Sequence, residues 1–144
     1  ITISNTFAGA NPLTVANNTV NTLVSTGAGG AVTGITCSNS STVVNINNNT
    51  VHTLSTTAGS ATVGIGVTGA ATTNVFRNKI YNLSGSNASS TVNGILVSSG
   101  TLVSVYNNLV GDLRTPAANA ANPLTNSSLK ASITQLARNS PISP

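Results

Sequence analysis

Few residues in this sequence could do acid–base or nucleophilic chemistry. It contains one acidic side chain, Asp112, one histidine, His52, and one cysteine, Cys37. A Ser-His-Asp arrangement would have to bring His52 and Asp112 together, and a thiol nucleophile would have to be Cys37. Paired-carboxylate glycoside hydrolysis needs two acids, which this chain does not supply. A carboxylate-built Ca²⁺ site likewise needs several acidic ligands. Whether any chemistry is possible therefore depends on where the fold places these three residues.

The elements that position them follow from a repeated phrase. Asn, one spacer, a β-branched residue, two more residues and Leu occur together four times, as in "NNTVNTL" and "NNTVHTL". Its Asn residues are Asn18, Asn49, Asn78 and Asn108, at steps of 31, 29 and 30 residues. Its β-branched and Leu residues are Val20, Val51, Ile80, Val110, Leu23, Leu54, Leu83 and Leu113. A step this regular is typical of a repeat architecture.

Two further phrases keep the same period. A Gly-Ile pair recurs thirty residues apart, at Gly34 with Ile35, Gly64 with Ile65, and Gly94 with Ile95. A short alternating apolar segment precedes each Asn of the first phrase. Each repeat thus has three short segments with the two-residue period of a strand, separated by Asn-rich or Gly/Ser-rich stretches. Three strands in about 30 residues predict one coil of a β-solenoid, with a β-meander sandwich as the alternative.

These phrases resemble right-handed parallel β-helix repeats of secreted and cell-surface bacterial proteins. The resemblance covers about residues 13–113 and implies a right-handed coil. We therefore expect an all-β parallel β-helix of about four coils over residues 1–124. An irregular or short helical C-terminal cap and tail are expected over 125–144, because Leu129, Ile133 and Leu136 have helical spacing. The resembling family includes adhesins, stalks, lyases and hydrolases, so the resemblance does not select an activity.

The fold expectation assigns a role to each residue of the repeat. The Asn residues are expected at corners, where Asn tolerates the left-handed conformation, with their side-chain amides stacked from coil to coil as a ladder. The alternative is that each Asn is a solvated turn residue. The residues that precede them, Asn17, Asn48, Arg77 and Asn107, are expected to face outward. The Val, Ile and Leu residues above, together with Ile35, Ile65 and Ile95, are expected to form core columns.

The same register separates the three candidate chemical residues. Cys37 occupies the repeat position of Val67 and Val97, which predicts a buried apolar role. His52 occupies the variable, outward position of Asn21 and Tyr81. His52 and Asp112 lie two coils apart, about 10 Å at the spacing of neighbouring strands, so a direct hydrogen bond is not expected. Asp112 and Arg114 are expected to pair locally. We predict no catalytic residue, no metal site and no cofactor.

Composition narrows the function classes further. Charged residues make up 4% of the chain, and the net charge of +4 rests on five scattered basic residues. Nucleic-acid binding is not expected, because it would need clustered Lys and Arg with stacking aromatic residues. Membrane insertion is not expected either, because no apolar run approaches the roughly 18 residues needed. We expect an extracellular or cell-surface protein.

The expected function is therefore structural and non-enzymatic: a stalk, adhesin or filament subunit. Its expected partners are further copies of itself, by end-to-end stacking of coils, or a larger surface protein. A carbohydrate-binding or carbohydrate-active β-helix is the alternative, with glycans as partners. Ice binding is a third interpretation, because Thr19 aligns with Thr50 and Thr22 with Thr53, although these Thr columns stop at Lys79 and Asn82.

Overall fold

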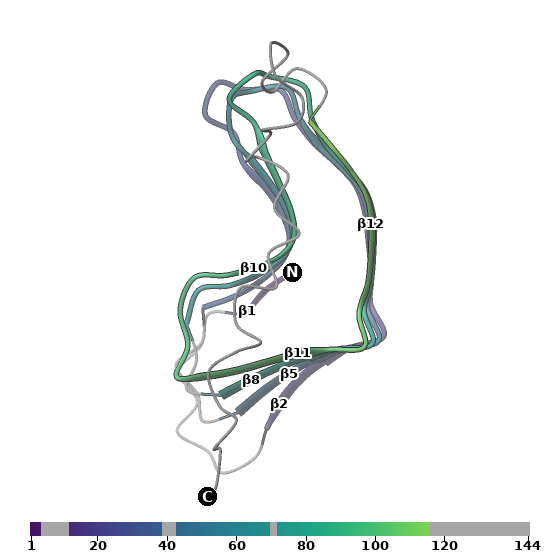
Figure 1. Cartoon of the computed structure of the whole chain (residues 1–144), viewed down its shortest axis with the longest axis vertical. Coiled ribbons are helices and arrows are strands. Elements are labelled where there is room, and N and C mark those ends of the chain that lie inside the picture. Colours follow the sequence, from purple (N-terminus) through teal and green to yellow (C-terminus); the bar gives the residue numbers. More distant parts are fainter. Residues whose placement is uncertain (4–11, 39–42, 70–71, 116–144) are drawn as a thin grey trace, which may run out of the picture.

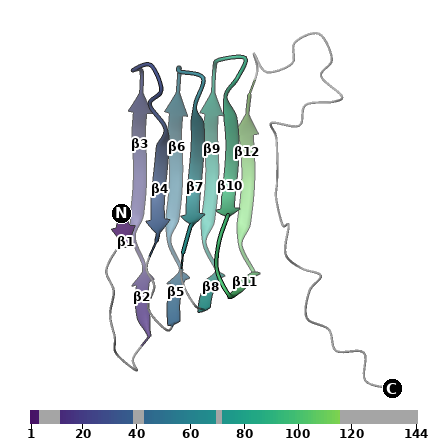
Figure 2. The ribbon, with the colours of Figure 1, turned by 90° about the vertical axis from the view of Figure 1, so that its left-hand side faces the viewer.

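A computed structural model describes residues 1–3, 12–38, 43–69 and 72–115, and these residues form three parallel sheets. Each sheet has four strands that come from successive coils (Figures 1 and 2). The first sheet contains β1 (Thr2–Ile3), β4 (Val32–Cys37), β7 (Ala61–Val67) and β10 (Thr91–Val97). The second contains β2 (Leu13–Ala16), β5 (Val43–Asn47), β8 (Thr72–Phe76) and β11 (Leu102–Tyr106). The third contains β3 (Thr19–Ser25), β6 (Thr50–Thr56), β9 (Lys79–Gly85) and β12 (Leu109–Arg114).

The strand pairing confirms the parallel β-solenoid predicted from the repeat. Val20, Val51, Ile80 and Val110 pair in register from β3 to β12, as do the Leu residues of the same phrase. Parallel neighbours require a long crossover, and here the other two strands of the coil provide it. The described residues contain no helix, and so none that could span a bilayer.

The solenoid makes about three turns. Its first three coils are complete, from β2 to β10, whereas β11 and β12 are the first two strands of a fourth. Strand β1 pairs with β4 and is the third strand of the coil that precedes β2. Figure 1 shows β11 running into β12, and β10 returning on the other side, with later coils nearer the viewer. This path is a right-handed coil. The predicted boundary at 124 and the predicted cap over 125–144 lie outside the described residues.

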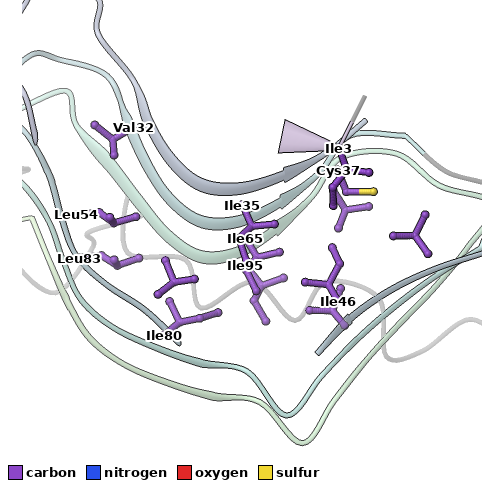
Figure 3. Packing of buried hydrophobic residues seen from close by; sticks show 14 of the residues in the cluster. Ile3, Val32, Ile35, Cys37, Ile46, Leu54, Ile65, Ile80, Leu83 and Ile95 are labelled. Carbon is purple, nitrogen blue, oxygen red and sulfur yellow. The ribbon is translucent and has the colours of Figure 1, made fainter. Parts of the chain in front are cut away.

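The core consists of columns of equivalent residues that stack from coil to coil (Figure 3). Ile35, Ile65 and Ile95 form one column, and Leu54 lies over Leu83 in the facing sheet. The central members of each column are completely buried, including Val51, Ile80, Leu54 and Leu83. End members are less covered, because they have a neighbouring coil on one side only. Leu23 is 39% exposed and Val110 37%, while Val20 and Leu113 are partly buried.

The recurring glycines are explained by the approach of the first sheet to the third. A Cβ atom on Gly64 would lie 2.5 Å from the Gly94 carbonyl oxygen and 2.6 Å from Cγ2 of Ile80. Gly34 and Gly94 are equally close to Val51 and Val110. Only glycine leaves room there for the β-branched residue of the opposite sheet. The Gly-Ile phrase and the Asn phrase are therefore two halves of one packing contact.

Candidate functional site

Four Asn residues stack at the corner between the second and third sheets. Nδ2 of Asn18 donates to Oδ1 of Asn49 at 2.9 Å, Asn49 donates to Asn78 at 3.0 Å, and Asn78 donates to Asn108 at 2.9 Å. The predicted asparagine ladder is thus confirmed. Asn49 and Asn78 are each 1% exposed, so the inner part of the ladder is buried.

Each side chain in the ladder also satisfies backbone groups. Oδ1 of Asn78 accepts a second hydrogen bond, of 3.0 Å, from the backbone N–H of Asn49. Nδ2 of Asn78 donates to the carbonyl oxygen of Ile46 in the preceding coil, at 2.9 Å. Buried amides of this kind cost free energy unless all their hydrogen-bonding groups are paired. Here the pairing partners come from neighbouring coils, so the ladder ties successive coils together.

The left-handed backbone conformation was expected at the ladder residues themselves, and this prediction is wrong by one position. The left-handed residues are those that precede them: Asn17, Asn48, Arg77 and Asn107, with φ between 53° and 60°. These four are exposed, as predicted for that position. The separation has a physical reason, because the left-handed residue turns the chain and the next residue can then point inward. Asn at the turn is favoured for its backbone and Asn in the ladder for its amide, so two different effects select adjacent Asn residues.

A second set of left-handed residues lies within the third sheet. Thr22, Thr53, Asn82 and Asp112 have φ between 54° and 56° and form a bend in the middle of each strand. Nδ2 of Asn82 donates a 3.1 Å hydrogen bond to Oγ1 of Thr53. This bend was not predicted from the sequence, although Thr, Asn or Asp recurs at a fixed step after each ladder Asn. The bend lies on the outer face, where these side chains are in contact with solvent.

The structure keeps the three candidate chemical residues apart. Cys37 is completely buried in the column of Val67, with its Sγ 3.9 Å from the carbonyl oxygen of Gly69. His52 points outward, and its ring stacks on Tyr81 with centroids 4.9 Å apart and an interplanar angle of 6°. Asp112 lies two coils from His52 in the same sheet. The described residues contain no group of three or more His, Cys, Asp or Glu that could hold a metal ion.

Asp112 pairs with Arg114 on the surface, as expected. The Arg114 guanidinium donates to both carboxylate oxygens, and also to Oδ1 of Asn82 at 3.1 Å. The hydrogen bonds that Arg114 donates to the Asp112 carboxylate, and to a lesser degree the charge of the guanidinium, hold the pKa of Asp112 below its usual value. The pKa of Arg114 is correspondingly raised. The only acidic side chain of the chain is therefore engaged with a cation on an exposed strand.

Two outward aromatic stacks were not predicted. Phe76 and Tyr106 stack with centroids 5.1 Å apart and parallel planes, in addition to the pair of His52 and Tyr81. Nζ of Lys79 lies 5.0 Å from the Tyr81 ring centroid. In the sequence, the two members of each pair occupy the same repeat position in successive coils, and this signal could have predicted the stacks. Stacked rings of this kind stabilise neighbouring strands by cross-strand contact.

The turns at the end of the third sheet are joined at their bases. Backbone N–H of Thr57 donates to the Ser25 carbonyl oxygen, and that of Ser86 donates to the Thr56 carbonyl oxygen, both at 3.0 Å. Oγ of Ser90 donates to the carbonyl oxygen of Ala58, also at 3.0 Å. Coil-to-coil hydrogen bonding thus continues from the strands into these turns.

Compared with known proteins, the chain matches no protein-family model, no curated protein sequence and no solved structure at a significant level.

Proposed function

We propose that this chain is a structural, non-catalytic β-solenoid of the cell surface or extracellular space: part of a stalk, adhesin or filament. The observation that carries the proposal is the asparagine ladder, which runs through all four coils without interruption. Its hydrogen bonds and the apolar columns beside it act between coils, along the axis of the solenoid. A molecule built in this way resists bending and local opening, because opening one coil breaks the ladder on both sides.

Composition supports the same proposal. The chain carries only five basic residues, and only three of them, Arg77, Lys79 and Arg114, lie in the described coils. Few charged residues mean few cleavage sites for trypsin-like proteases. The backbone N–H of Lys79 is also hydrogen-bonded to the carbonyl oxygen of Asn49 at 2.8 Å. A protein exposed to proteases benefits both from few cleavage sites and from a hydrogen-bonded backbone at such a site.

Limited proteolysis tests the proposal. Trypsin should leave the bonds after Arg77 and Lys79 intact in the native protein at 37 °C and cut both in the denatured chain. Mass spectrometry of the fragments locates each cut. Rapid native cleavage after Arg77 or Lys79 would contradict a durable structural role, since it would show that the central coils open readily. Turnover of any member of a polysaccharide panel would contradict the non-catalytic part of the proposal.

The outward aromatic stacks favour glycan binding as a second candidate function. Tyr106 is 47% exposed and its ring stacks on that of Phe76, so the pair presents an amphipathic surface on the second sheet. A glycan array tests this candidate, with Tyr106→Ala as the variant and Ser104→Ala in the same strand as the control. Binding that is lost in Tyr106→Ala alone would support it, and no binding by the native protein would rule it out for the glycans on the array.

A further inference from the structure

Two basic residues lie at one corner of the solenoid, between the second and third sheets, without an acidic partner. Arg77 and Lys79 flank the buried ladder residue Asn78, and both side chains are exposed. The sequence contains a single acidic side chain, Asp112, and Arg114 donates to both of its carboxylate oxygens. The protein therefore has no second carboxylate side chain for Arg77 and Lys79, and their counter-charge is left for another molecule to supply.

These two cations depart from the repeat. The equivalent residues are uncharged in the other coils: Asn17, Asn48 and Asn107 for Arg77, and Thr19, Thr50 and Leu109 for Lys79. Arg77 also has the left-handed backbone conformation, with φ of 55°, which Asn tolerates and a long side chain disfavours. Neither the repeat nor the backbone conformation therefore accounts for an arginine at this position.

Aromatic rings lie on both sides of this corner. On the third sheet, Nζ of Lys79 is 5.0 Å from the ring centroid of Tyr81. On the second sheet, Phe76 directly precedes Arg77, and its ring stacks on that of Tyr106. The Phe and Tyr side chains that the structure describes thus adjoin the two cations. The corner combines positive charge with amphipathic rings on one continuous surface.

The backbone that carries the two cations is fixed by hydrogen bonds between coils. Nδ2 of Asn78, which lies between them, donates to Oδ1 of Asn108 at 2.9 Å. The backbone N–H of Lys79 donates to the carbonyl oxygen of Asn49 at 2.8 Å. A ligand that binds here has to order side chains but not the backbone, and this lowers the entropic cost of binding.

The other polar side chains around the corner are neutral hydrogen-bonding groups. On the second sheet, Nδ2 of Asn74 donates to Oδ1 of Asn45 at 2.9 Å. On the third sheet, Nδ2 of Asn82 donates to Oγ1 of Thr53 at 3.1 Å. Amides and hydroxyls beside a few cations complement a polymer with many hydroxyl groups and widely spaced negative charges.

Other anionic partners match this surface less well. Double-stranded nucleic acid carries a charge about every 1.7 Å and binds through many cations, whereas this corner has two. Nucleic-acid bases stack on open aromatic faces, but here the Phe76 ring is stacked on that of Tyr106 and the Tyr81 ring on an imidazole. Anionic lipid surfaces attract clusters of roughly four to eight basic residues. Charge and polarity together therefore favour an acidic polysaccharide.

We propose that the corner at Arg77 and Lys79 binds an acidic polysaccharide, whose carboxylate or sulfate groups pair with the two cations. The outward edges of the Phe76 and Tyr81 rings then contact its sugar rings, and the neighbouring amides bind its hydroxyl groups. This inference rests on glycan binding, the second candidate function, and names the class of glycan. It also extends the binding surface from the second sheet onto the third.

Three dextrans form a matched set of probes, because dextran, carboxymethyl-dextran and dextran sulfate share one backbone and differ in charge. Microscale thermophoresis of the full chain measures the affinity for each. We expect both charged dextrans to bind at least about tenfold more tightly than dextran, and their binding to weaken as salt is added. The tighter of the two identifies the acidic group. Equal binding of neutral dextran would overturn the acidic class and leave glycan binding standing, and no binding of either charged dextran would overturn the proposal.

The site variant is Arg77→Asn/Lys79→Thr, whose new residues are those found one coil earlier, at Asn48 and Thr50. Asn is well suited to the left-handed corner, so this variant should fold. The control, Lys130→Gln/Arg138→Gln, removes the same net charge from basic residues outside the described part of the chain. We expect the site variant to bind charged dextrans about tenfold more weakly and the control to bind as the native protein does. Equal losses would show that net charge binds the polymer, and would overturn the corner site.

Polydeoxythymidine tests for a nucleic acid as the partner of this corner. Tighter binding of this polymer than of either charged dextran would overturn the polysaccharide. The comparison of dextrans uses the native protein, so it decides the proposal even if a variant fails to fold. The proposed structural role is tested separately, by tryptic cleavage of the native coils, and none of these binding results would change it.

Discussion

Nδ2 of Asn49 donates a 3.0 Å hydrogen bond to Oδ1 of Asn78, which lies one coil further along the chain, and both side chains are buried. This contact joins residues 29 positions apart through side chains alone. Backbone hydrogen bonds hold the strands of a parallel sheet together at many positions. The ladder adds a contact at the corner, where regular strand pairing is interrupted by a left-handed residue. We therefore expect it to control how firmly the coils are held at their corners.

The first prediction concerns the loss of one ladder amide. Asn78→Ala removes the hydrogen bonds that Nδ2 of Asn78 donates to Asn108 and Ile46. It also leaves the backbone N–H of Asn49 without its side-chain acceptor, while Nδ2 of Asn49 keeps only its bonds to backbone carbonyl oxygens. The expected loss in the free energy of unfolding is about 2–4 kcal/mol, because buried groups are left unpaired. Asn74→Ala in the same coil is the matched control, since its half-buried amide has one side-chain bond, to Asn45. Urea denaturation of both variants measures the difference, and equal losses would contradict the assigned role.

The second prediction concerns a buried hydroxyl. Oγ1 of Thr73 has no hydrogen-bond partner within the described residues and lies in the apolar column of Val44 and Val103. Thr73→Val keeps the shape of the side chain and removes the unpaired group, so the free energy of unfolding should rise by about 1–2 kcal/mol. The buried Thr62 is the control, because its Oγ1 donates to the carbonyl oxygen of Ser84 at 2.9 Å. Thr62→Val should therefore destabilise, and stabilisation by both variants would refute the argument.

The fold could be predicted from the repeat because the same local requirement recurs in every coil. A Val or Leu at a fixed step must face inward in every coil, or the columns would be broken. The left-handed conformation was assigned to the wrong Asn, because adjacent Asn residues such as Asn48 and Asn49 look alike in sequence and only the backbone path separates their roles. The outward stacks of His52 on Tyr81 and of Phe76 on Tyr106 depend on side-chain orientation across coils. A pattern that emphasises buried positions gives little weight to such contacts.

The third prediction concerns the close approach between sheets. Gly64→Ala forces a methyl group against the Gly94 carbonyl oxygen and Ile80, which should cost about 1–3 kcal/mol by overpacking. Gly111→Ala is the control, because its methyl group would meet open space. The control should be neutral or slightly stabilising, since alanine restricts the unfolded chain more than glycine does. Thermal unfolding followed by circular dichroism compares the two, and a tolerated Gly64→Ala would show that the sheets are not packed as described.

The fourth prediction concerns acid. Because the pKa of Asp112 is lowered in the folded protein, its contribution to stability is present above the pKa of the unfolded chain, which is near the ordinary aspartate value of 3.8. That contribution is lost as the pH falls through the lower folded pKa. NMR titration of the native protein should find the Asp112 pKa below its usual value, and Arg114→Gln should raise it toward 3.8. An unchanged Asp112 pKa in Arg114→Gln would show that the ion pair does not form in solution.

Hydrogen exchange of the Asn side-chain amides tests most directly whether a buried ladder joins the coils. NMR can measure exchange at Nδ2 of Asn49 and Asn78 beside that of Asn48, which is exposed at the corner. We predict that the Asn49 and Asn78 amides exchange only when the coils open, more slowly than the Asn48 amide by several orders of magnitude. Exchange of all three amides at the rate of a solvated side chain would contradict a buried ladder that joins the coils.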